Sequence, residues 1–197
     1  MMRIAAVLLA AICCNTLFGP RTAIAGAAVP EHALSARFRR QLVAAAQHAS
    51  GFENQFKARV WLLDMSTRLR QYVPTPSRRE ALLKQVHMQA RRAGINPQLV
   101  MAVIQVESRF KRFAISPSGA RGLMQIMPFW KKTIGRNRDN LFQMQTNLRY
   151  GCTILAHYLK VEHGNRVRAL ERYNGSLGSP YYPERVDQAL RRHWAVH

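Results

Sequence analysis

Apolar residues recur at helical spacing along the first part of this chain. Residues 31–73 carry the pattern with one break at 50–51, and the apolar positions of the second half are Phe56, Val60, Leu63 and Leu69. The pattern should stop at Pro74-Thr-Pro76, because proline disfavours helical backbone in the residue before it. We therefore predict a helical segment that ends before residue 77.

The later part of the chain predicts more helices. Ser77 can cap one over 78–92, and Asp139 or Asn140 can start another that ends before Gly164. A further helix is expected over 167–173 and a last one from Pro183. Long alternating strands are absent from the sequence, so the predicted class is mainly α.

A small β element is expected in the middle of the chain. Turn signals at 116–119 and 121–122 precede a short apolar run over 123–127. This order of turns and apolar residues predicts a small hairpin or loop that folds beside the preceding helix.

That preceding helix is the most apolar one. Asn96 is a good N-cap and Pro97 suits the first helical position, while residues 99–106 are apolar except for Gln105. A helix that is apolar on every side is usually a core helix. Glu107 follows at helical spacing on the stripe made by Val100, Val103 and Ile104.

Glu107 has two interpretations. One is a partly buried glutamate paired with Arg109, Arg112 or Arg121, because buried glutamates usually have a partner. The other is a general acid, whose pKa an apolar wall would raise so that a proton is available near neutral pH. The local pattern leaves both open.

Three stretches carry a family resemblance. They are Glu107-Ser-Arg-Phe110, then Ser116-Pro-Ser-Gly-Ala-Arg-Gly-Leu-Met-Gln-Ile-Met-Pro128, then Tyr173-Asn174. In order and spacing they resemble the signature of the soluble-lytic-transglycosylase (SLT) domain, over residues 78–190. That family has a goose-type lysozyme-like fold and cleaves bacterial peptidoglycan. The resemblance implies a mainly α (α+β), lysozyme-like domain with a small β-hairpin or sheet, preceded by a helical extension.

The resemblance also implies roles for single residues. Glu107 and Tyr173 would be catalytic, with the Tyr173 hydroxyl orienting the carboxylate, and the substrate-binding residues would be Ser116, Gln125, Met127 and Asn174. From the residues alone, Tyr173 could equally be a core aromatic, Ser116 a turn residue and Gln125 an exposed strand residue. Four other aromatics receive no role, because aromatic side chains more often serve packing: Phe129, Trp130, Tyr181 and Tyr182.

The reaction implied is that of a peptidoglycan lytic transglycosylase. Glu107 would act as acid and then as base in forming 1,6-anhydro-MurNAc, whereas ordinary glycosidases use two carboxylates. No other acidic residue in the matched region lies in a motif that resembles the family's active site. A lysozyme-like muramidase and a non-catalytic, basic cell-wall-binding protein stay as alternatives.

Charge and the amino terminus bear on compartment and partners. The formal net charge of +20 implies a polyanionic partner, which can be nucleic acid, anionic lipid or cell wall. Arg3 and the apolar run over 4–14 predict a signal peptide over 1–25, with lipidation at Cys13 or Cys14 or an uncleaved anchor as alternatives. We therefore expect a periplasmic or secreted, monomeric protein that acts on peptidoglycan glycan strands. We also expect that it can serve an envelope-spanning assembly and that it does not bind nucleic acid.

The expected organisation has three parts. They are a signal peptide over 1–25, a helical extension over 26–77 and the SLT catalytic domain over 78–197. Cys152 lies on a helical stripe with Leu148, Leu155 and Leu159, which favours a core residue over a nucleophile. The histidines form no HExxH arrangement, so no metal and no cofactor are expected.

Overall fold

The structure is a computed structural model that describes residues 49–195, which lie within one compact unit spanning 45–197. The signal peptide, Cys13, Cys14 and the helix predicted before residue 49 lie outside the described residues. The elements of the described part are α2 (Ala49–Leu69), α3 (Pro76–Arg92), α4 (Pro97–Ser108), α5 (Trp130–Ile134), α6 (Met144–Val161), α7 (Arg166–Asn174), α8 (Tyr181–Ala189) and the π-helical turn η2 (Leu190–Trp194).

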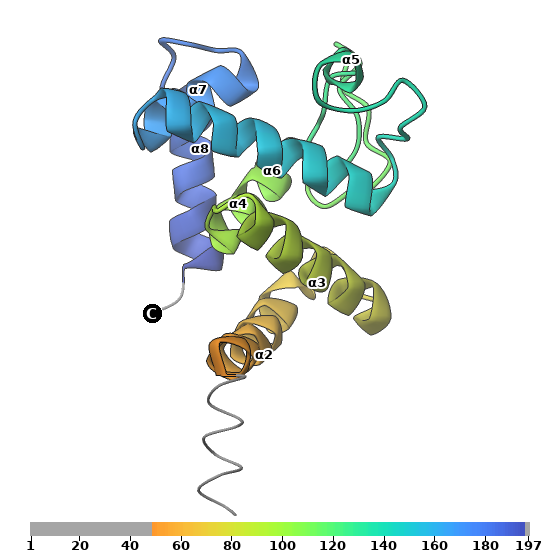
Figure 1. The fold of residues 1–197 in the computed structure, drawn as a ribbon, viewed down its shortest axis with the longest axis vertical. Coiled ribbons are helices and arrows are strands. Elements are labelled where there is room, and N and C mark those ends of the chain that lie inside the picture. Colours follow the sequence, from red (N-terminus) through yellow and green to blue (C-terminus); the bar gives the residue numbers. More distant parts are fainter. Residues whose placement is uncertain (1–48, 196–197) are drawn as a thin grey trace, which may run out of the picture. The chain divides into compact units, whose positions relative to one another are not determined.

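Helix α4 is the core helix, as its sequence predicts. It contacts α3, α8 and η2 (Figure 1). The side chains from Val100 to Ile104 are fully buried. The Asn96 side chain caps the helix by accepting hydrogen bonds from the backbone N–H groups of Gln98, at 2.7 Å, and Leu99, at 3.4 Å. The N-cap that the sequence predicts is therefore confirmed.

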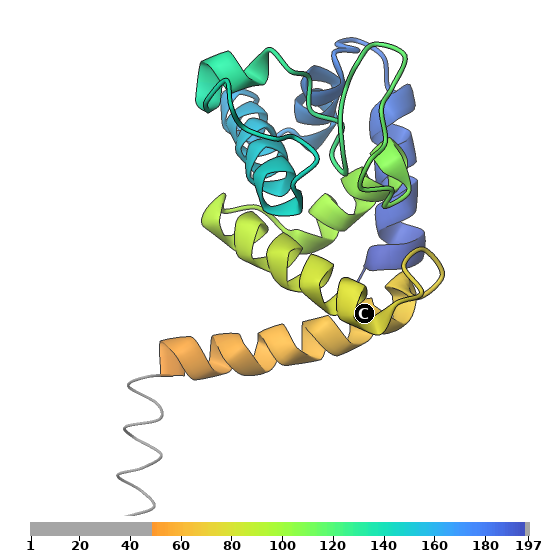
Figure 2. The same cartoon turned by 90° about the vertical axis from the view of Figure 1, so that its right-hand side faces the viewer.

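Helix α2 packs against α3 and η2, and Figure 2 shows it running beneath α3. The face that it buries differs in part from the predicted one. Of the predicted apolar positions, Leu69 is buried while Phe56, Val60 and Leu63 are exposed. The other buried side chains among the described ones of α2 are Trp61 and Met65. Because α2 carries two apolar stripes, its sequence alone could not decide which one the α3 surface would cover.

Several helix ends differ from the predicted ones. Helix α2 includes Ser50 and Gly51, where a break was expected, because a helix tolerates a single glycine at a cost of about 1 kcal/mol. Helix α3 starts at Pro76, so Ser77 lies inside it. Helix α6 starts at Met144, because Asn140 caps a turn instead by accepting a 2.9 Å hydrogen bond from the Phe142 N–H.

The predicted hairpin over 114–127 is not confirmed. This segment is a loop with two isolated antiparallel bridges, and the described residues contain no strand. The positive φ angles of Gly119, Gly122 and Gln125 interrupt any extended run. The mainly α class is thus confirmed for the described part of the chain, and the β element is reduced to a shaped loop.

Side chains from two helices fix this loop in place of a strand partner. Asn147 of α6 accepts a 2.8 Å hydrogen bond from the Met124 N–H and donates to the carbonyls of Arg121 and Leu141, each at 2.8 Å. Ser108 of α4 donates to the Leu123 carbonyl at 2.8 Å. The loop therefore has a definite shape beside the end of α4, where Glu107 lies.

Candidate active site

Glu107 lies in the last turn of α4, and the chain bends sharply just after it. Arg109 and Phe110 adopt left-handed backbone conformations with φ of 50° and 65°, which non-glycine residues rarely adopt. Phe110 is buried against the rings of Tyr72 and Trp194, at centroid distances of 5.1 and 5.5 Å. Because this packing holds the bend, the helix ends with the Glu107 carboxylate facing a cleft.

The environment of Glu107 raises its pKa to about 7. The main cause is burial, which disfavours the charged form, and two smaller effects favour it: a hydrogen bond from Tyr182 and the positive charge of Arg185. The Tyr182 hydroxyl donates to Glu107 Oε1 at 2.6 Å. A carboxyl group with this pKa can give up a proton and take one back near neutral pH.

The ion-pair interpretation of Glu107 finds no support among the described residues. Glu107 takes part in no salt bridge there. Arg112 donates to the Phe142 carbonyl at 2.9 Å and Arg121 lies over the Phe142 ring, while Arg109 is exposed and lines the same cleft as Glu107 without an ion pair to it.

Tyr173, predicted to orient Glu107, makes a different contact. Its hydroxyl donates to the Met124 carbonyl at 2.8 Å, and the hydroxyl that reaches Glu107 is that of Tyr182. Burial raises the pKa of both tyrosines well above its ordinary value, and the Glu107 charge raises it further. Both phenols therefore stay protonated and serve as hydrogen-bond donors, Tyr173 to the loop and Tyr182 to the carboxylate.

A cleft of about 630 Å³ opens over Glu107. Its walls come from the end of α4, from the loop over 114–125 and from α8 with η2. The structure brings Ser116 and Gln125 to this cleft together with Glu107. Within the described part of the chain, Tyr173, Asn174 and Met127 do not line it.

Ser116 and Gln125 are themselves held by the loop. Ser116 Oγ accepts a 3.0 Å hydrogen bond from the Ala120 N–H and lies 2.8 Å from Ser118 Oγ. Gln125 Nε2 donates to the carbonyls of Ala114, at 3.2 Å, and Gly122, at 2.8 Å. With its amide group fixed in this way, Gln125 presents its side chain to the cleft in one orientation.

Several residues that the structure brings to Glu107 have no role in the sequence-based prediction. Tyr182 contacts it directly, while Arg185, Arg192 and His193 line the cleft. A signal for Tyr182 existed, because it lies at helical spacing with Val186 and Ala189 on the buried face of α8, and a buried tyrosine needs a hydrogen-bond partner. Its partner, 75 residues away, is visible only in the folded chain.

Cys152 is buried, and burial raises the pKa of its thiol to about 12, so it is a core residue and a poor nucleophile. Among residues 49–195, no three His, Cys, Asp or Glu side chains lie where they could share a metal ion. In the same range no helix is both long enough and apolar enough to span a membrane.

Comparison with known proteins places the chain in a family. The family model of the Transglycosylase SLT domain matches residues 84–189, more than half of the chain. The chain therefore belongs to this family, and the resemblance seen in its motifs is confirmed.

Individual proteins are similar to parts of this chain. The membrane-bound lytic murein transglycosylase C of Actinobacillus pleuropneumoniae serotype 5b (strain L20) and that of serotype 3 (strain JL03) are each 37% identical over 73 residues, covering 37% of this chain and 16% of theirs. The chain thus spans only a small part of these relatives. The X-ray structure of an inactive mutant of the lytic transglycosylase Slt from Pseudomonas aeruginosa matches with a TM-score of 0.44 and 23% identity, over 56% of this chain and 22% of that one.

Proposed function

We propose that the protein is a peptidoglycan lytic transglycosylase. It would cleave the β-1,4 bond between N-acetylmuramic acid and N-acetylglucosamine and leave a 1,6-anhydro-MurNAc end. One observation carries the proposal: among the described residues that line the cleft, Glu107 is the single acidic side chain, and its pKa is about 7. A hydrolase that follows the usual scheme would need a second carboxylate to activate water.

In the proposed mechanism Glu107 acts twice. First it gives its proton to the glycosidic oxygen while the bond from that oxygen to C1 breaks, so that the N-acetylglucosamine side leaves as an alcohol. The carboxylate then takes the proton of the muramyl C6 hydroxyl while the C6 oxygen bonds to C1. Glu107 ends protonated and no water is consumed. Attack within one sugar gains the proximity advantage of an intramolecular reaction.

Neighbouring groups support both steps. The Tyr182 hydroxyl donates to Glu107 Oε1 and so stabilises the carboxylate that forms after the first proton transfer. Arg185 adds positive charge on the same side of the cleft and also favours the ionised form. Ser116 and Gln125 line the cleft beside Glu107 and are proposed to contact the sugars that flank the scissile bond. Tyr173 is proposed to act through the loop, because it holds the Met124 carbonyl.

We infer an envelope location, periplasmic or secreted, from two supports. The substrate lies outside the cytoplasmic membrane, and the A. pleuropneumoniae relatives carry the name membrane-bound. The division into a signal peptide, an extension over 26–77 and a catalytic domain over 78–197 stays a prediction, as do the monomeric state and any envelope assembly that the protein serves.

A digest of purified peptidoglycan tests the proposed function. The full chain should release anhydro-muramyl products that mass spectrometry identifies, and Glu107→Gln should release none. Glu80→Gln is the matched control, because Glu80 lies on the exposed surface of α3 and pairs only with Lys84. Reducing ends would indicate a muramidase instead. Full activity of Glu107→Gln would contradict the mechanism, and tight wall binding without cleavage by the unmodified chain would indicate a binding protein.

A further inference from the structure

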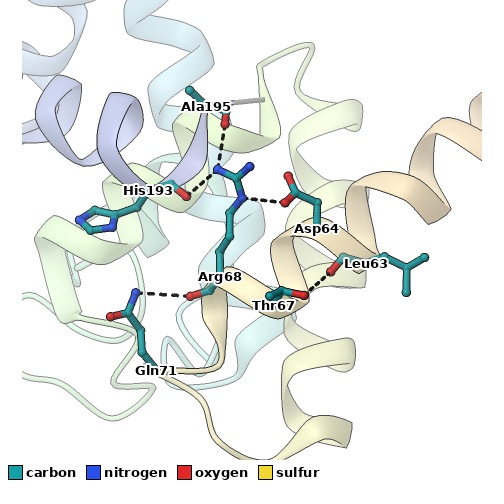
Figure 3. A network of polar contacts seen from close by, with 7 residues as sticks. All are labelled: Leu63, Asp64, Thr67, Arg68, Gln71, His193 and Ala195. Atoms are coloured by element: carbon teal, nitrogen blue, oxygen red, sulfur yellow. Dashed lines mark hydrogen bonds and ion pairs between the residues drawn. The ribbon is translucent and has the colours of Figure 1, made fainter. Parts of the chain in front are cut away.

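The end of the chain forms one wall of the cleft, and this wall is held from two sides. Arg68 of α2 donates from Nη1 to the carbonyls of His193, at 3.2 Å, and Ala195, at 2.9 Å, while its Nε donates to Asp64 at 2.8 Å (Figure 3). These bonds satisfy backbone carbonyls at the end of η2 that would otherwise lack partners.

The second anchor of this wall is the ring of Trp194. Trp194 is fully buried, and its indole N–H donates to Gln105 Oε1 at 2.6 Å. Gln105 lies on α4, two residues before Glu107. The turn η2 is therefore fixed by its backbone to α2 and by its last side chain to the catalytic helix, so the residues that it carries have defined positions at the cleft.

Arginines of α8 and η2 make this wall strongly basic. Arg185 and Arg192 line the cleft, and they also line a second hollow of about 600 Å³ together with Arg191. The remaining residues of this hollow, called here the arginine hollow, are Tyr181, Glu184 and Gln188. Arg185, Gln188 and Arg192 line both cavities, so the arginine hollow adjoins the cleft along α8 and η2.

The arginines of this hollow have no carboxylate partner within the described residues, and Glu184 is the single acidic side chain among them. The nearby helix α7 behaves differently. Its Arg166 is paired with Asp187, at 3.0 Å, and its Arg168 with Glu162, at 2.7 Å. The Arg185 guanidinium lies over the Tyr181 ring, 5.6 Å from its centroid, which orients it. Its planar set of N–H donors is thus available for an oxyanion.

We propose that the arginine hollow is a subsite for carboxylate groups carried by the glycan strand next to the scissile bond. The inference rests on the proposed function and adds to it. Arginine binds carboxylates through paired N–H donors, and the acidic peptide attached to muramic acid supplies such carboxylates. Because the hollow shares three lining residues with the cleft, a strand in the cleft lies beside it, which favours a substituent of the substrate over a separate anionic polymer.

The test measures binding without turnover, in full-length Glu107→Gln protein. Soluble glycan strands are used with their peptides and after the peptides have been removed enzymatically. We expect the peptide-bearing strands to bind about tenfold more tightly, as two charge-assisted contacts allow. Adding Arg185→Gln and Arg192→Gln should remove this preference. Adding Arg70→Gln and Arg92→Gln instead removes the same charge from exposed sites outside both cavities. This control pair should keep the preference for peptide-bearing strands.

Each result decides between distinct conclusions. Equal affinity for both strands leaves the proposed function standing and overturns the subsite. Equal loss of preference in the control pair shows general charge attraction and also overturns it. A third arm measures the binding of a soluble phosphodiester polymer. If Arg185→Gln and Arg192→Gln weaken the binding of this polymer and leave the preference for peptide-bearing strands intact, the hollow binds a separate polymer and the proposal fails. If neither strand binds, the proposed function itself fails.

Discussion

The two walls of the cleft are built in different ways. The loop over 114–127 is held by side chains of α4, α6 and α7, namely Ser108, Asn147 and Tyr173. The opposite wall, η2, is held by Arg68 of α2, which precedes the matched family region of 84–189. The first wall thus depends on the family domain alone, while the second depends also on a helix outside it. The difference means that changes in α2 can disturb the second wall without touching the loop.

The largest effect on stability is expected from the loop over 114–127. Asn147→Ala removes three hydrogen bonds and leaves the Met124 N–H and the carbonyls of Arg121 and Leu141 without their partner. We expect the free energy of unfolding to fall by about 3 kcal/mol or more, with loss of activity. Urea denaturation measures this change. Asn137→Ala, at an exposed position, is the control, and equal stability of the two variants would show that the loop does not depend on Asn147.

The next effect concerns Glu107, which lies between the walls. Its pKa is about 7 in the folded protein against an ordinary 4.5, so the folded state keeps a proton that the unfolded chain loses over this range. The stability of the unmodified protein should therefore fall by about 2 to 3 kcal/mol as pH rises from 4.5 to 7. Glu107→Gln does not titrate and should escape this fall. Denaturation at several pH values tests it, and a constant difference between the two proteins would contradict the pKa.

Removing one hydroxyl from each of the two tyrosines compares the two walls, because Tyr182 contacts Glu107 and Tyr173 contacts the loop. Tyr182→Phe removes the donor to the Glu107 carboxylate, so the pKa of Glu107 should rise, the pH profile of cleavage should move to higher pH, and the rate should fall about tenfold. Tyr173→Phe releases the Met124 carbonyl and should leave the position of the profile unchanged. The reverse pattern would restore the direct role that the sequence resemblance implies for Tyr173.

The smallest effect is expected from Arg68 of α2, which holds η2. Arg68→Gln loses the bonds to the His193 and Ala195 carbonyls and should lower stability by about 1 kcal/mol. KM for peptide-bearing strands should rise about threefold while kcat and the pH profile stay in place, as two loosened hydrogen bonds would give. Asp64→Asn keeps both carbonyl bonds and should change KM less. A drop in kcat alone would contradict a positioning role for Arg68.

Much of the fold could be predicted because it depends on neighbours along the chain. The Asn96 cap, the apolar body of α4 and the place of Glu107 on its stripe follow from spacing within a few turns, and the structure confirms them. The loop motif likewise brought Ser116 and Gln125 to the cleft. The apolar positions predicted for α2 were wrong except for Leu69, because the buried face depends on which surface α3 offers.

By itself, the sequence determined the core helix, its carboxylate and the motifs that resemble the family. Only the tertiary structure decided which hydroxyl meets Glu107, which helix holds η2, and which arginines face the cleft. These contacts join residues 75 to 127 positions apart, as in Tyr182 with Glu107 and Arg68 with Ala195. Helical periodicity carries no information over such separations, because it reports only which face is buried and not what lies against it.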